Sequence, residues 1–120
     1  MKIGVPMEPL GETRVAIVPG SMKKLLKSGF EVVVESGAGN AANYLDSEYS
    51  NAGATVSNRS AVMSCEIVIA IRIPEIKELS KGQIVACVAD PFRHPGIIQE
   101  CIDNGITLLS MDMIPRRLSR

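Results

Sequence analysis

The stretch MKIGVPMEPLGETRVAIVPG, residues 1–20, decides how the rest of the chain is interpreted. Its apolar run Lys2–Val5 stops at a proline, which favours a short buried strand over a helix. A polar loop follows over residues 7–13, and Arg14 then heads an apolar run that ends in Pro19-Gly20, where a helix is expected to begin. These parts are typical of an anion-binding edge in an α/β fold, although an ordinary connection with a surface arginine contains the same parts.

The length and composition of the chain indicate one globular domain whose balanced charge does not favour binding to nucleic acid or to a membrane. The 120 residues are 46% hydrophobic and 22% charged, which argues against disorder. Thirteen Lys and Arg balance thirteen Asp and Glu, and aromatic residues make up only 3%, so nucleic-acid binding is not expected. No apolar run approaches the roughly 20 residues of a membrane span, and no secretory signal opens the chain. We therefore expect a cytoplasmic protein without direct membrane insertion.

The three cysteines, Cys65, Cys87 and Cys101, are widely spaced in apolar surroundings. Their spacing matches neither a disulfide framework nor a zinc pattern. They are interpreted as small core residues, and no metal site is predicted.

Short helices and strands are expected to alternate along the whole chain. Strands are expected over residues 2–5, 31–35, 66–71, 83–89 and 106–109, with a brief extended piece at 55–56. Helices are expected over residues 21–28, 46–49, 59–64 and 95–102, with Asp46 and Asn58 as N-caps, Pro95 as a first helical residue and Gly29 as a C-terminal cap. This alternation predicts an α/β fold, a mostly parallel sheet with flanking helices in a Rossmann-like or flavodoxin-like three-layer lobe.

Two further patterns bear on the sheet. The run 66–71 lacks apolar–polar alternation, so both of its faces are expected to be covered. The turn Ser36–Asn40 contains G-x-G without a third glycine, which favours a close-packed turn over a phosphate loop.

Ligands of parallel sheets gather beyond the carboxyl ends of the strands, and four charged residues are expected near that edge: Arg14, Arg72, Asp90 and Asp112.

Together these residues resemble the N-terminal region of the alanine dehydrogenase and proton-translocating NAD(P) transhydrogenase family. The resemblance rests on Pro6, the E-x-R-V of residues 12–15, Pro19, the V-V-E-S-G-A-G of residues 33–39 and the A-G-A of residues 52–54. It covers essentially all 120 residues. It implies that residues 1–120 form the N-terminal lobe of a two-lobed unit, whose Rossmann NAD-binding lobe is absent from this sequence.

Two positions help to choose the branch of the family. Arg72 stands where the alanine dehydrogenases carry a substrate-binding lysine, and Asp90 stands where they carry a histidine. Arginine keeps the positive charge but stays protonated at any working pH, so it cannot serve as a proton-transferring amine. The one histidine, His94, is interpreted as a helix-start residue. Both replacements favour the transhydrogenase branch.

The end of the chain, SMDMIPRRLSR over residues 110–120, resembles a segment that lines the NAD site in the transhydrogenase α subunit. The resemblance gives nucleotide-contacting roles to Arg116 or Arg117, Ser119 and Arg120. One extra residue after the proline leaves open which of the two arginines matches. Arg14 and Arg72 remain candidates for holding a substrate anion, and no catalytic residue is assigned.

The resemblance implies a part of an NAD(H)-binding unit that supports hydride transfer between NADH and NADP on a partner subunit. The expected partners are the Rossmann lobe, the other transhydrogenase subunits and a second copy in the intact assembly, with peripheral inner-membrane association through those subunits. The chain alone is expected to bind NAD weakly or not at all. Two alternatives stay open: the substrate lobe of an alanine-dehydrogenase-like enzyme, with Arg14 and Arg72 clamping a carboxylate, or a non-catalytic binding or assembly module.

Overall fold

The computed structural model describes residues 1–88 and 95–110, and their six strands form one sheet. The strands are β1 (Lys2–Val5), β2 (Glu31–Glu35), β3 (Thr55–Ser57), β4 (Ile67–Arg72), β5 (Ile84–Val88) and β6 (Thr107–Ser110). All neighbouring strands are parallel, in the order β3-β2-β1-β4-β5-β6. The predicted α/β class and parallel sheet are confirmed.

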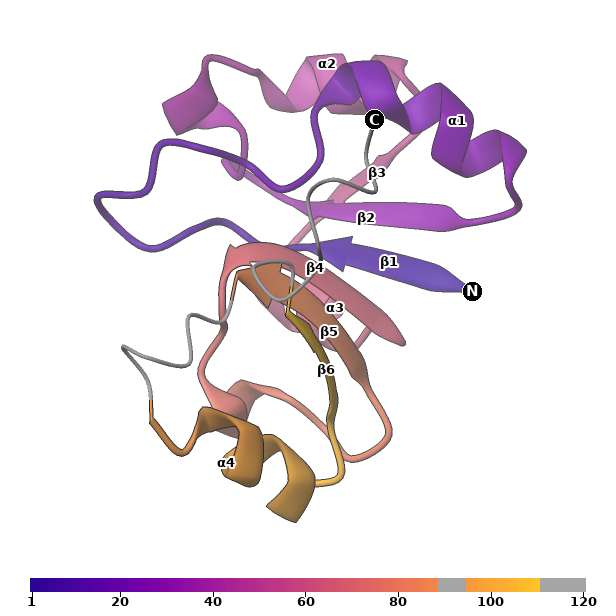
Figure 1. Ribbon diagram of the computed structural model, residues 1–120. Helices are drawn as coiled ribbons and strands as arrows, with labels where there is room; N and C mark the ends of the chain where they lie inside the picture. The colour runs from indigo at the N-terminus through magenta and orange to yellow at the C-terminus, as the bar shows by residue number, and fades with distance from the viewer. Residues whose placement is uncertain (89–94, 111–120) are drawn as a thin grey trace, which may run out of the picture.

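Helices cover the two faces of this sheet in an order that follows from its connections. They are α1 (Met22–Lys27), α2 (Asp46–Asn51), α3 (Arg59–Met63) and α4 (Ile97–Asp103), with 3-10 turns η1 (Pro19–Ser21), η2 (Asn40–Ala42) and η3 (Ile76–Glu78). Figure 1 shows α1 and α2 on one side of the sheet and α4 on the other. Parallel connections are right-handed, so the reversal of strand order at β1 sends the later helices to the opposite face.

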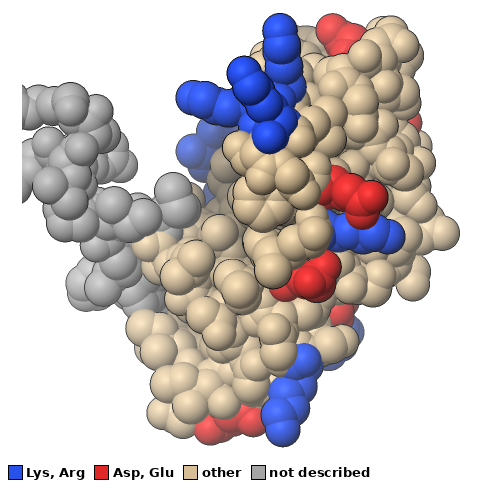
Figure 2. All heavy atoms as spheres, turned by 90° about the vertical axis from the view of Figure 1, so that its right-hand side faces the viewer, with Lys and Arg blue, Asp and Glu red and all other residues tan. Residues whose placement is uncertain are grey.

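Alternate residues of β2 show the two faces of the core. Val32 and Val34 belong to a buried cluster with Met22 of α1 and Tyr49 of α2, both fully buried. Val33, between them, belongs to a second cluster that contains residues of α3, β4, β5 and α4. On the far side from this core, lysines of α1 gather at the surface, at the top of Figure 2.

The expectation that β4 is covered on both faces is confirmed for residues 67–70, whereas β5 and β6 leave one of their faces exposed. Ile67 and Ile69 pack against the first cluster, but farther along that face Val88 is 37% exposed and Leu109 is 52% exposed. No helix among the described residues covers β5 and β6 on the α1 side (Figure 1). The right-handed connection from β5 to β6 places α4 on the other face, which explains why local chain segments leave this one open.

Two details of the expected helix starts are wrong: α2 begins at Asp46 as expected, but Asp46 is not its N-cap, and α4 does not begin at Pro95. The N-cap of α2 is Leu45, while the Asp46 carboxylate accepts hydrogen bonds from Ser36 Oγ at 2.7 Å and from the Gly37 amide at 2.9 Å. α4 begins at Ile97 after Gly96 in the left-handed region (φ 90°), so Pro95 lies outside the helix. A proline N-terminal to a helix predicts its start only to within a few residues.

Other local predictions are confirmed. The Asn58 side chain accepts a hydrogen bond from the Ala61 amide at 2.9 Å and caps α3. Gly29 follows α1 with φ +95°, the left-handed conformation of a C-terminal cap. The turn after β2 is close-packed, since a Cβ on Gly39 would lie 2.8 Å from a ring atom of Tyr49. Its Gly37 amide is bound to Asp46, so this turn is not a phosphate loop.

Candidate functional site

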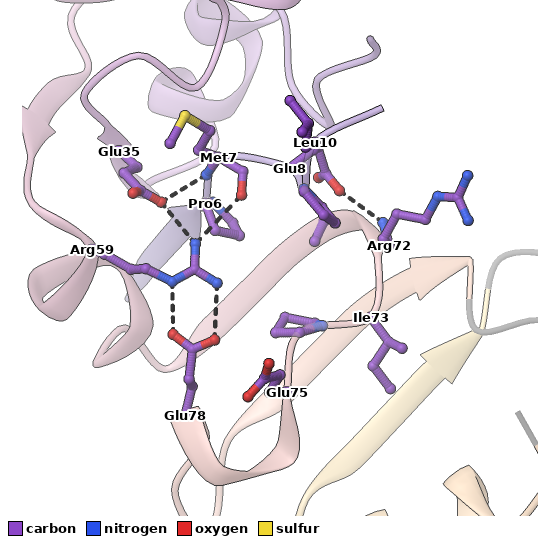
Figure 3. Close-up of a pocket in the computed structure, with 13 residues that line it drawn as sticks. Pro6, Met7, Glu8, Leu10, Glu35, Arg59, Arg72, Ile73, Glu75 and Glu78 are labelled. Carbon is purple, nitrogen blue, oxygen red and sulfur yellow. Dashed lines mark hydrogen bonds and ion pairs between the residues drawn. The ribbon is translucent and has the colours of Figure 1, made fainter. Parts of the chain in front are cut away.

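The strand order reverses between β1 and β4, and open parallel sheets bind ligands beyond the carboxyl ends of their strands at such a point. A pocket of about 390 Å³ lies there. Figure 3 shows its walls, which come from the loop after β1, the end of β2, the start of α3 and the segment that follows β4. This edge is therefore the candidate functional site.

Glu8 joins the first loop to the end of β4. Its two carboxylate oxygens accept hydrogen bonds from the amides of Ile71 at 2.8 Å and Arg72 at 2.9 Å. The β4–β5 register shifts between Ile69 and Arg72, and Glu8 satisfies backbone donors at this irregularity. Burial raises the pKa of Glu8, although the two amides act in the opposite direction.

The structure brings together Arg14 and Arg72, the two arginines predicted to hold an anion. Glu12 bridges them, with its Oε2 atom 2.9 Å from Arg14 Nε and its Oε1 atom 3.0 Å from Arg72 Nε. The Glu12 side chain is only 6% exposed, whereas those of Arg14 and Arg72 are 65% and 51% exposed. Hydrogen bonds from the Arg14 side chain and amide, and then from Arg72, lower the pKa of Glu12 to about 2.

Arg59 forms a second ionic cluster, whose members line the pocket. Its guanidinium pairs with Glu78 of η3 at 2.6 Å and with Glu35 of β2 at 3.0 Å, as Figure 3 shows. Glu35 Oε1 also accepts the Met7 amide at 2.8 Å. Arg59 holds the pKa of Glu78 below its usual range, and Glu78 in turn raises the pKa of Arg59. This cluster anchors the first loop where it leaves β1.

Glu35 stands at the end of β2, beside β1, where dinucleotide-binding sheets carry the acid that holds a ribose. Its Oε1 atom is already bound by Met7 and Arg59. In such sheets a glycine-rich turn also leads directly from the first strand into a helix, whereas here residues 6–18 separate β1 from η1. The sheet thus has the strand order of a dinucleotide-binding sheet, but its described carboxyl edge lacks the glycine-rich turn that binds the phosphates in such sheets.

Several site residues escaped sequence analysis. Glu8 and Glu12 flank the turn of the first loop. Glu12 begins the E-x-R-V motif of residues 12–15, but neither glutamate was assigned a role in the site. Nothing in the sequence pairs Arg59 with Glu35 or Glu78, because these residues belong to three different elements, α3, β2 and η3. Other predicted residues lie outside the described residues, and their positions stay predictions: Asp90, His94, Asp112, Arg116, Arg117, Ser119 and Arg120.

Within residues 1–88 and 95–110, no cluster of three or more His, Cys, Asp or Glu side chains is arranged to hold a metal ion. No helix in these ranges is long and apolar enough to cross a membrane. Cys65, Cys87 and Cys101 are buried and form no disulfide, and burial raises the pKa of Cys65 and Cys101. The prediction that these cysteines are core residues is confirmed.

The sheet order and the charged carboxyl edge define an open, doubly wound α/β domain with a pocket at its switch point. The chain belongs to the alanine dehydrogenase/PNT N-terminal domain family, whose model matches residues 4–120. It is 38% identical to the NAD(P) transhydrogenase subunit alpha of Cereibacter sphaeroides, covering 97% of this chain and 23% of that protein. It is 30% identical to the alanine dehydrogenase of Bacillus subtilis, covering 95% of this chain and 32% of that one.

A solved structure of the transhydrogenase from Sinorhizobium meliloti superimposes with a TM-score of 0.90 at 32% sequence identity. The match covers 97% of this chain and 36% of that one, so this chain spans about a third of that structure. The family resemblance seen in the sequence is confirmed, and the names of these relatives place the chain in a family of oxidoreductases.

Proposed function

We propose that this chain is the first lobe of the NAD(H)-binding unit of an NAD(P) transhydrogenase alpha subunit. In that unit a hydride passes between NADH and NADP held on a partner subunit. The observation that carries the proposal is Arg72, which ends β4 and binds Glu12 at 3.0 Å. A permanently protonated guanidinium occupies the place where an acid–base amino-acid dehydrogenase needs a lysine. Hydride transfer between two nicotinamides is the chemistry of the cofactors and requires positioning rather than a protein acid or base.

The relatives support the same assignment, since the 38% identical one is named a transhydrogenase subunit. We propose that Arg116 or Arg117, together with Ser119 and Arg120, contacts NAD. A second lobe must supply the phosphate cradle, because residues 6–18, rather than a short glycine-rich turn, lead from β1 to η1. Further proposed partners are the other transhydrogenase subunits and a second copy of the alpha subunit, with peripheral association to the inner membrane through them.

Calorimetric titration of NADH tests this proposal. The chain is titrated alone and then mixed with the separately expressed remainder of the Cereibacter sphaeroides subunit. We expect binding heat that exceeds the heat from the remainder alone. Arg120→Ala should remove this excess, whereas Lys27→Ala, on the exposed face of α1, should keep it. A mixture that binds NADH no better than the remainder alone contradicts the proposal and favours a binding or assembly module.

A second candidate function is the substrate lobe of an alanine-dehydrogenase-like enzyme. It is favoured by the position of Arg14 and Arg72 on one shared carboxylate, since paired guanidinium groups suit a substrate carboxylate. The same mixture, supplied with pyruvate, ammonium and NADH, distinguishes the two functions. Formation of alanine would support the dehydrogenase. Transfer of a hydride to an NADP analogue without alanine, once the partner subunit that holds NADP is added, would support the transhydrogenase.

A further inference from the structure

We propose that Arg14 and Arg72 form an anion clamp and that Glu12 is its positioning residue. The Glu12 carboxylate binds one side of each guanidinium group, and the nitrogen atoms that it leaves free then bind one small oxyanion. The inference rests on the anion role proposed for the two arginines and adds the residue that sets their geometry. Glu12 stays in place when the anion binds.

The relative exposure of the three side chains decides which of them meets a ligand. The Glu12 side chain is 6% exposed, while Arg14 and Arg72 are 65% and 51% exposed. The arginines therefore cover the carboxylate and form the outer layer of the cluster. The backbone also holds Glu12 in place, since its Oε2 atom accepts a hydrogen bond from the Arg14 amide at 3.1 Å.

The donors that Glu12 leaves unused are those available to a ligand. Arg72 gives Glu12 only its Nε, and Arg14 gives its Nε and Nη2. Among the described residues, no side chain or carbonyl accepts a hydrogen bond from Arg14 Nη1 or from either Nη atom of Arg72. Figure 3 shows the Arg72 side chain extending away from Glu35, Arg59 and Glu78, so the two ionic clusters stay separate.

The charges around the clamp define the class of ligand. Arg14, Arg72 and Glu12 together carry one net positive charge, and Glu8 is a further carboxylate beside them among the described residues. Both Glu8 oxygens are occupied by the amides of Ile71 and Arg72. Guanidinium groups bind planar or tetrahedral oxyanions through paired N–H donors, so the ligand is a small carboxylate or a phosphoryl group.

The opposite role for Glu12 would be that of a competitor, which an incoming anion must displace. The two roles predict opposite effects of weakening Glu12. If Glu12 competes with the anion, a shorter carboxylate side chain at position 12 releases the two arginines and raises their affinity for the anion. If Glu12 positions the arginines, the same change disorders them and lowers that affinity. Glu12→Asp makes this change without altering the charge, so a simple electrostatic effect is excluded.

Nitrogen-15 NMR of the arginine Nε–H groups provides the test on the whole 120-residue chain. Inorganic phosphate and pyruvate are titrated separately, and the Arg14 and Arg72 signals are expected to shift together with one dissociation constant. In Glu12→Asp the Arg72 signal should move toward that of a solvated arginine before any anion is added. The affinity for the anion should fall about fivefold, as when one charged hydrogen bond at a partly exposed site is lost.

Glu31→Asp is the matched control, because Glu31 is an exposed residue at the start of β2, at the end of the strand opposite to the carboxyl edge. It should leave the dissociation constant unchanged. An equal or tighter affinity in Glu12→Asp overturns the positioning role, and wild-type signals that respond to neither anion overturn the clamp. A response to only one anion identifies the ligand as carboxylate or phosphoryl. Because no NADH or second lobe is present, this result is independent of the test of the proposed function.

Discussion

Arg59 and Glu78 form a two-point ion pair, with Nε 2.6 Å from Oε2 and Nη2 3.0 Å from Oε1. The pair joins the start of α3 to the connection between β4 and β5. The same guanidinium donates to Glu35 at 3.0 Å, and Glu35 in turn holds the Met7 amide. One arginine thus ties three connections at the carboxyl edge, the edge that carries the anion clamp.

Replacing Arg59 by Met should destabilise the fold, because Glu35, 8% exposed, keeps its charge and loses its cation. Since the Arg59 side chain is 39% exposed, solvent screens part of the effect, and we expect a loss of about 1–2 kcal/mol. Urea unfolding measures it. Lys77→Met, in the exposed pair with Glu75, should change stability by less than about 0.5 kcal/mol. Equal losses in the two variants would show that the Arg59 cluster contributes no more than a surface pair.

Gly4→Ala tests the contact between β1 and α3. A Cβ at this position would collide with the carbonyl oxygen of Val62 and lie 3.2 Å from Cys65 Cβ. We expect a loss of about 2–4 kcal/mol, because the backbone of α3 must move away from the sheet. Gly20→Ala is the control, since a Cβ there meets no atom within 4 Å. Thermal unfolding compares the two, and a Gly4→Ala variant as stable as Gly20→Ala would contradict the close packing.

Much of the fold could be predicted because its signals are local. The apolar run of β4 and the side-chain oxygen of Asn58 act within a few residues, and the structure confirms both the strand and the cap. The expected approach of Arg14 and Arg72 to one edge is also confirmed, since all carboxyl ends of a parallel sheet share that edge.

The rest depended on contacts between distant residues. Glu12 and Arg72 are separated by 60 residues, so their pairing requires β4 to lie beside β1, which no periodicity reveals. Asp46 was mispredicted for a similar reason, because a tertiary contact with Ser36 replaced its local capping bond. Local patterns therefore predicted the elements and two cations of the site, Arg14 and Arg72, but neither Arg59 nor the carboxylates that pair with these arginines.

The pH dependence of stability should report the bridge at Glu12. The pKa of Glu12 is lowered from 4.5 to about 2 in the folded chain, so its stabilisation is present above about pH 4.5 and is lost as the pH falls toward 2. Asp46 and Glu78, whose pKa values are also lowered, act in the same direction. Glu8 acts oppositely, because its raised pKa favours the folded state as the pH falls.

The specific contribution of Glu12 is isolated by comparison with Glu12→Gln, in which position 12 does not titrate. The wild type should exceed the variant in urea midpoint by a constant amount between about pH 5 and 7. That difference should shrink below about pH 4.5 and nearly vanish at pH 2, where Glu12 becomes protonated. A difference that persists undiminished at pH 2 would show that shape, rather than charge, accounts for the stabilisation.

Leu108 and Leu109 are neighbours on β6 whose side chains face opposite sides of the sheet. Leu108 packs against the buried cluster of α3 and α4, whereas Leu109 is 52% exposed on the face that no described helix covers. Leu108→Ser should cost about 2 kcal/mol, and Leu109→Ser less than about 0.5 kcal/mol. Urea unfolding measures both. If Leu109→Ser is as destabilising as Leu108→Ser, this face is covered in solution, and the exposed face of β5 and β6 takes part in the core.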